Sequence, residues 1–282
     1  MATSKPVKKV VQSDIQTAET PSSDEPTWTP GPEAKAQANR LRLIAIALWV
    51  VAIAVECVAI FGLILKKPVQ VDPTSAVKTY PFFGAQLSQN AYFGWLIALI
   101  ILSGILAVLG SLTWKKANRL DPASTKDPVR FFIQNQLGAI IAMIAFIPLL
   151  ILVIMDKNLK GAQRGIAIAV AAIVLGGATA AGTTINAPSV EQYNTDAQVV
   201  MAINGKDEVY WVKGGSVYHL CSTSTDLQQT SADNQIYSGT LDQAHAAGKT
   251  RLAYRNECGC DNTDKTGTCG LNLANLPSDQ PS

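Results

Sequence analysis

One ionisable side chain, that of Glu56, lies inside a long apolar stretch of the chain, residues 43–65. An acid in an apolar environment is costly and usually has a polar partner or water, so Glu56 is a candidate functional group. It could carry a proton or bind a polar group of a partner protein. The alternative is a protonated acid that hydrogen-bonds within its own protein. A single acid is poor support for a transport pathway, which usually needs several such groups.

Thiols gather in the last quarter of the sequence. Four of the five cysteines lie there: Cys221, Cys258, Cys260 and Cys269. An even number of cysteines favours disulfides in an oxidising compartment. Metal binding is an alternative, although the single residue between Cys258 and Cys260 is a poor spacing for a tetrahedral zinc site. Free thiols are the third possibility.

The two histidines, His219 and His245, lie in the same region. His219 is on a predicted alternating strand and is expected to pack half-buried. His245 is in an Ala-rich predicted helix and is expected to face solvent. Neither stands beside a cysteine together with an obvious third orienting group, as a nucleophilic site requires. We therefore expect the cysteines to stabilise the protein rather than to catalyse a reaction.

The sequence lacks motifs for cofactors. No histidine precedes His219, whereas a haem or copper centre in the membrane needs His, Met or Cys ligands. There is no C-x-x-C-H haem attachment, phosphate loop or Gly-rich dinucleotide fingerprint. The formal charge of +2 is too even to indicate nucleic acid as a partner. We expect a protein without cofactors and without enzymatic activity.

Four long apolar stretches dominate the chain: residues 43–65, 92–114, 137–155 and 165–185. At about 1.5 Å of rise per residue, each can cross a hydrocarbon core of about 30 Å, although 137–155 only just does so. Cationic and aromatic residues flank them, as is typical of membrane–water interfaces. The sequence thus predicts a membrane all-α fold, a four-transmembrane-helix bundle over residues 40–187. Short connections favour one compact antiparallel bundle.

The fourth stretch is rich in small residues that form overlapping small-xxx-small pairs. They are Gly176, Gly177, Ala178, Ala180, Ala181 and Gly182. Such surfaces let helix backbones approach closely in lipid. They could dock on another membrane protein or pack within the chain's own bundle, and the spacing alone does not decide between the two.

Outside the apolar stretches, the sequence divides into three further parts. Residues 1–39 are polar and rich in proline and are expected to be disordered. Residues 190–260 predict a small α+β domain, with a Gly-Gly turn between two strands and a helix whose N-terminus has capping-box spacing at Thr240 and Gln243. Residues 261–282 are expected to form a Cys-containing loop and a disordered end.

An even number of crossings places both termini on one side of a membrane. Eight Lys and Arg residues lie near the membrane on that side: Lys35, Arg40, Arg42, Lys115, Lys116, Arg119, Lys126 and Arg130. Six lie on the other side: Lys66, Lys67, Lys78, Lys157, Lys160 and Arg164. The positive-inside rule favours cytoplasmic termini by this narrow margin. The even number of cysteines favours the opposite orientation.

Two resemblances rest on particular stretches. The pattern VYW-x-x-GG-x-VYH, followed by I-x-SGT-x-x-x-A-x-x-AGK and a cysteine, resembles a small bacterial module in which a Tyr-His, a Cys and a C-x-x-C can hold a metal. This chain departs from it, since Cys258-Gly-Cys260 replaces the C-x-x-C. The whole layout, with ANRLRLIAIALWVVAIAVE opening the four stretches and VYWVKGGSVYHLCS after them, resembles actinobacterial accessory subunits of the cytochrome bcc–aa3 respiratory supercomplex.

That resemblance implies a role in assembling or stabilising a respiratory complex. We therefore expect a non-catalytic accessory subunit in the plasma membrane, whose partners are bcc–aa3 subunits and membrane lipid. Candidate docking residues are Glu56, Gly176, Gly177, Ala180, Ala181 and Gly182. One alternative is a membrane-anchored metal or redox sensor that uses the Cys and His residues of the C-terminal domain. Another is a small transporter that uses Glu56.

Overall fold

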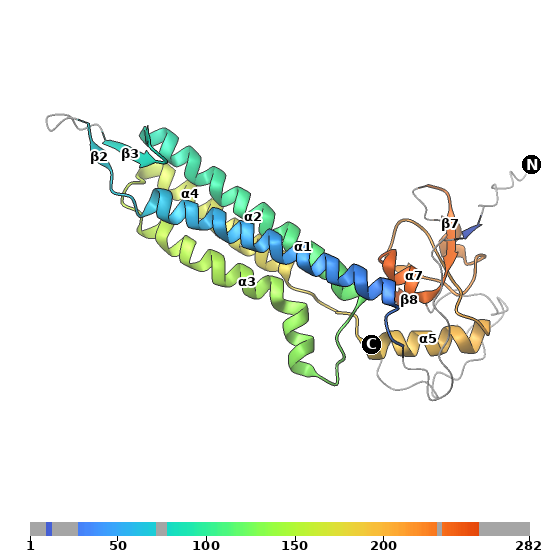
Figure 1. Ribbon diagram of the computed structural model, residues 1–282. Helices are drawn as coiled ribbons and strands as arrows, with labels where there is room; N and C mark the ends of the chain where they lie inside the picture. The colour runs from blue at the N-terminus through green and yellow to red at the C-terminus, as the bar shows by residue number, and fades with distance from the viewer. Residues whose placement is uncertain (1–9, 13–27, 72–77, 230–232, 254–282) are drawn as a thin grey trace, which may run out of the picture. The chain divides into compact units, whose positions relative to one another are not determined.

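The computed structural model describes residues 10–12, 28–71, 78–229 and 233–253, and the structural statements below concern these residues. The chain divides into two compact units (Figure 1). The helical unit comprises Asn39–Lys115 and Phe132–Ala187. The mixed unit comprises Met1–Ala38, Lys116–Phe131 and Pro188–Ser282.

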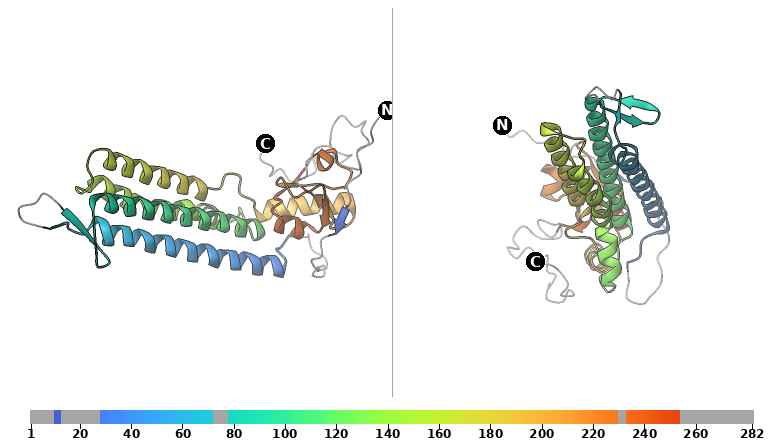
Figure 2. Two further views of the ribbon diagram at one scale, coloured as in Figure 1. Left: turned by 90° about the horizontal axis from the view of Figure 1, so that it is seen from above. Right: turned by 90° about the vertical axis from the view of Figure 1, so that its left-hand side faces the viewer.

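Four long helices pack side by side in the helical unit (Figure 2). They are α1 (Pro32–Cys57), which continues as the π-helix η1 (Val58–Ile64), α2 (Gln89–Leu120), α3 (Pro128–Met155) and α4 (Gly161–Gly182). All four are long and apolar enough to cross a membrane. The prediction of four such helices is confirmed, and the protein is mostly helical, with a small strand-containing C-terminal region.

The inward face of α1 and η1 has a spacing of alternately three and four residues. Its buried side chains are Ala45, Trp49, Ala52, Glu56, Ala59 and Leu63. This repeat places one side chain per turn on a single seam, as in helices that pack nearly in parallel. Apolar side chains on the opposite face, such as Leu43 and Val50, are exposed. A helix that exposes its most apolar face is unlike a helix of a water-soluble domain.

Helix α2 contacts each of the other three helices. The indole Nε1 of Trp49 in α1 donates to the carbonyl oxygen of Ala107, at 3.3 Å. The indole Nε1 of Trp114 in α2 donates to the carbonyl oxygen of Gln134 in α3, at 2.7 Å. Gly104 leaves room for a valine side chain of α4. The buried seams of the four helices form one core.

A small antiparallel sheet, which we did not predict, connects η1 to α2. Its strands are β2 (Val69–Gln70), β3 (Lys78–Phe82) and β4 (Ala85–Leu87). Tyr80 in β3 is buried against the ring of Tyr92 in α2, with 4.5 Å between ring centroids. The hydroxyl of Tyr92 donates to Asp156 Oδ2, at 2.6 Å. The sheet is thereby fixed to the ends of the helices.

The mixed unit contains short strands and helices. Its elements are β1 (Val10–Gln12), α5 (Val190–Asn204), β5 (Val209–Trp211), β6 (Val217–Tyr218), α6 (Thr225–Gln229), β7 (Ile236–Gly239), α7 (Leu241–Ala246) and β8 (Arg251–Leu252). The sheet order is β1-β7-β5, with β1 parallel and β5 antiparallel to β7. A second, parallel pair joins β6 and β8.

Two local predictions for this region are confirmed. Thr240 and Gln243 form a reciprocal capping box at the start of α7. The backbone groups of Tyr210 and His219 exchange hydrogen bonds of 2.8 and 2.7 Å across the Gly-Gly turn. Gly215 in that turn has φ of 76°, a conformation that glycine adopts without steric cost.

The start of α1 lies inside the stretch 1–39 that we expected to be disordered. Trp28 donates its backbone N–H to Asn194 Oδ1, at 2.8 Å, and its indole Nε1 to Asp242 Oδ1, at 3.1 Å. The backbone N–H of Gly31 donates to Asp242 Oδ2, at 2.9 Å. These bonds order residues 28–31 because they satisfy polar groups that would otherwise be solvated. The expected loop and end at 261–282 lie outside the described residues.

Candidate functional site

The outward face of α4 is made largely of small residues. Gly176, Gly177 and Ala180 are exposed. A Cβ atom built at Gly176 or Gly177 would meet no atom within 4 Å. The same face continues toward the start of the helix through exposed small residues at Gly165, Ala169 and Ala172. Exposed isoleucines, Ile166 and Ile173, flank this stripe. The face is therefore a shallow notch that no described part of the chain fills.

Other small residues of the predicted set turn inward. Ala178 and Gly182 are buried. A Cβ at Gly182 would overlap the backbone of Gly138 and Ala139 in α3, so glycine is required for this close approach. Ala181 is half-buried. The predicted set thus divides into an inner group that packs α4 on α3 and an outer group that is open.

Glu56 lies on the inward seam of α1, between Ala52 and Ala59, and is 4% exposed. Its Oε1 atom has no hydrogen-bond partner among the described residues. The side chain therefore points into the helical unit, away from any partner on the outer surface. The structure does not bring Glu56 together with the outward face of α4, and its burial favours the alternative of a group internal to the bundle.

The C-terminal cysteines are described only at Cys221, which is disulfide-bonded. Cys258, Cys260 and Cys269 lie outside the described residues. His219 is more buried than expected, at 2% exposure, and its Nδ1 lies 3.2 Å from the hydroxyl of Ser224. Within the described residues, no group of three or more His, Cys, Asp or Glu side chains is placed to hold a metal ion.

The expectation that His245 faces solvent was wrong. His245 is buried, and its ring stacks on Tyr193 with 3.6 Å between centroids and an angle of 17° between planes. Trp28 and Tyr218 approach the same ring edge-on. Neither ring nitrogen has a hydrogen-bond partner among the described residues. Burial lowers the pKa of His245 to about 3, because the apolar surroundings disfavour the charged form.

Sequence reasoning also missed a buried cation, Lys249. Its side chain is 1% exposed, and Nζ donates to the carbonyl oxygens of Gly214 and Gly215 at 3.0 and 2.9 Å. A third carbonyl, that of Lys213, lies at 3.4 Å. Burial lowers the pKa of Lys249. The ammonium group holds the Gly-Gly turn in place, which is a structural role. The only local signal was the position of Lys249 directly after Gly248, the glycine that follows the C-cap residue of α7.

Comparisons with known proteins add no relative to this picture. The chain matches no protein-family model, no curated protein and no solved structure. Its candidate functional surface is therefore defined by its own geometry, which includes the open outward face of α4.

Proposed function

We propose that the chain is a non-catalytic, four-span membrane subunit that docks on a larger integral-membrane complex through the outward face of α4. The observation that carries this proposal is the open notch at Gly176, Gly177 and Ala180. Lipid tails fill a flat glycine face poorly, whereas a partner helix can approach it closely and gain contacts along its length.

The three chain segments that make up the mixed unit support four crossings of the membrane. Its three stretches, Met1–Ala38, Lys116–Phe131 and Pro188–Ser282, belong to one compact unit and must lie on one side of a membrane. Between the first two stretches the chain runs through α1 and α2, and between the last two through α3 and α4. Each pair of helices has to leave that side and return to it. This order of segments is consistent with the proposed four spans, in which each helix pair leaves one side of the membrane and returns to it.

We propose a respiratory complex of the cytochrome bcc–aa3 type, in a bacterial plasma membrane, as the partner. This identification rests on the resemblance of the chain's layout to actinobacterial accessory subunits. An accessory role is consistent with the outward notch on α4 and with the burial of Glu56 inside the helical unit.

We also propose that the mixed unit lies outside the cytoplasm. The disulfide at Cys221 favours an oxidising compartment. The positive-inside count favours the opposite side by only two residues, eight against six. A disulfide persists poorly in the reducing cytoplasm. We therefore give the disulfide at Cys221 more weight than the difference of two basic residues.

The docking proposal is tested with a pair of Gly→Leu variants. Gly177 in α4 and Gly94 in α2 are both exposed, and a Cβ at either position meets no atom within 4 Å. Gly177→Leu should lower the recovery of bcc and aa3 subunits in a mild detergent severalfold, because the new side chain separates the helices. Gly94→Leu should leave the recovery unchanged.

Both variants should insert and accumulate as the wild-type protein does, since both side chains point outward. If the Gly177→Leu and Gly94→Leu variants recovered equal amounts of bcc and aa3 subunits, docking through α4 would be refuted. Retention of no bcc or aa3 subunit by the wild-type chain would refute the proposed partner. Quantitative mass spectrometry of the purified complexes distinguishes these outcomes.

A further inference from the structure

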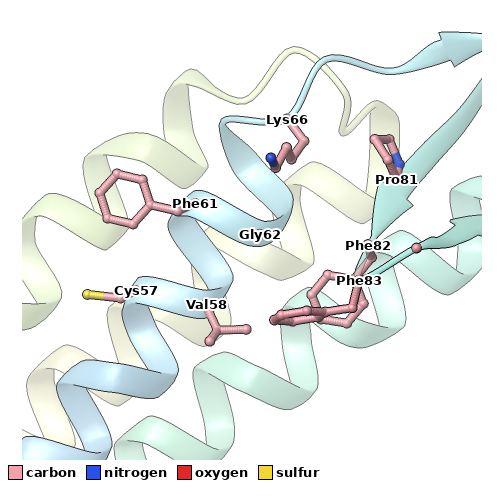
Figure 3. Close-up of a pocket in the computed structure, with 9 residues that line it drawn as sticks. Cys57, Val58, Phe61, Gly62, Lys66, Pro81, Phe82 and Phe83 are labelled. Atoms are coloured by element: carbon pink, nitrogen blue, oxygen red, sulfur yellow. The ribbon is translucent and has the colours of Figure 1, made fainter.

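An open groove lies between the end of α1–η1 and the β3–β4 hairpin (Figure 3). Its helical wall includes Val58, Phe61 and Gly62, and its hairpin wall includes Phe82 and Phe83. The groove has a volume of about 570 Å³, within the range of small-molecule sites. All the residues that line it belong to the helical unit.

The backbone around the groove is irregular on both walls. The helical wall is a π-helix, in which the backbone N–H of Leu65 donates to the carbonyl oxygen of Ile60, at 2.9 Å. Such segments are rare and occur often at functional sites. On the hairpin, Phe83 has φ of 45°, in the left-handed region that bulky residues seldom adopt. Phe83 is 82% exposed at the mouth of the groove.

The wall residue Gly62 sets the width of the groove. A Cβ at this position would lie 3.2 Å from Cε2 of Phe82, so any larger residue would crowd the hairpin. Phe61, one residue earlier, is 62% exposed. The two walls therefore present aromatic and aliphatic surface that no described residue covers.

One end of the groove is cationic. Lys66 lines it, and its side chain is exposed. Other cations lie on the same end of the helical unit: Lys67, Lys78, Lys157, Lys160 and Arg164. Among the described residues of this end, the acid is Asp156, which is buried and accepts hydrogen bonds from Tyr92 and from the backbone of Asn158. The surplus of positive charge indicates an anionic occupant.

We propose that the groove binds one anionic phospholipid, with an acyl chain along the apolar walls and the phosphate beside Lys66. This inference rests on the membrane location in the proposed function. A purely apolar occupant would leave the cationic end of the groove without a counter-charge. An amphiphile with one negative headgroup matches both the apolar walls and the lysine.

The test uses the full-length purified protein in detergent, titrated with phosphatidylglycerol or with phosphatidylcholine and followed by native mass spectrometry. The wild-type protein should retain one phosphatidylglycerol at concentrations where phosphatidylcholine is lost. Lys66→Gln should weaken phosphatidylglycerol binding by about fivefold, the effect of one cationic side chain near an anionic headgroup. Lys67→Gln, an exposed neighbour that does not line the groove, is the matched control and should bind as the wild type does.

Three outcomes would overturn the proposal. Equal retention of the two lipids would indicate a neutral apolar occupant. Equal losses in Lys66→Gln and Lys67→Gln would indicate diffuse surface attraction. Displacement of the lipid by millimolar inorganic phosphate would indicate a site for a free anion. None of these outcomes affects docking through α4, because Gly177→Leu is scored on recovery of protein subunits.

Discussion

Acid should destabilise the mixed unit through His245. The ring is buried between aromatic side chains, and its pKa is lowered from 6.5 to about 3. As the pH falls, a group whose pKa is lowered by folding is protonated in the unfolded state before it is protonated in the folded state. Stability is therefore full above pH 6.5, falls as the pH drops from 6.5 to 3, and is constant below. Each pH unit in that window costs about 1.4 kcal/mol, so about 2 kcal/mol should be lost by pH 5.

The matched variant is His245→Phe, which keeps an aromatic ring against Tyr193 but cannot be protonated. Hydrogen exchange of the α5 backbone in the intact protein, corrected for the intrinsic rate at each pH, measures the free energy of opening. The wild type should lose about 2 kcal/mol more than the variant between pH 7 and pH 5. Burial raises the pKa values of Asp207 and Asp242. Both acids remain in the variant, so their contributions cancel. An equal loss in the two proteins would refute the assignment to His245.

The remaining predictions concern three other residues. Lys249→Met should lower the stability of the mixed unit by about 2 kcal/mol, because three carbonyl oxygens lose a charged donor; unchanged exchange protection at β5 would contradict this. Glu56→Gln should leave recovery of the partner subunits at the wild-type level, because the side chain faces its own bundle; a loss comparable to that of Gly177→Leu would place Glu56 in the docking contact. A phosphatase reporter that is active only outside the cytoplasm should be active when it is fused after Ala253. An inactive fusion would contradict the orientation inferred from Cys221.

Features encoded by neighbouring residues could be predicted from the sequence. The four apolar helices follow from runs of apolar side chains, and the capping box follows from Thr240 and Gln243, which lie three positions apart. The division of the small residues could not be predicted. Gly177 and Gly182 belong to the same run, but only packing against α3 shows that Gly182 faces inward and Gly177 outward.

The missed features depend on contacts between residues far apart in the chain. His245 looked exposed because its neighbours are alanines, whereas Trp28 and Tyr193 bury its ring. Asp242 binds Gly31 across 211 positions of the sequence. No local sequence pattern predicts such pairings. The polar, proline-rich composition around Trp28 indicated disorder instead. The groove beside η1 was missed because it depends on the close approach of Gly62 in η1 to Phe82 in β3, which follows it in the chain only after the turn through β2.

The hydrogen bonds from Trp28 and Gly31 to Asp242, which clamp the start of α1 to α7, can form only late in biosynthesis. A ribosome makes residues 28–31 first and the partner acid only after all four helices have been completed. Until then, the indole of Trp28 lacks its acceptor on Asp242, and β1 lacks its parallel partner β7, so these contacts cannot form. If the four helices cross a membrane as proposed, this clamp can form only after each helix pair has returned the chain to the side on which it started. In that proposed arrangement, a molecule with one helix left uninserted would hold Trp28 and Asp242 on opposite sides of the membrane, and the clamp could not form.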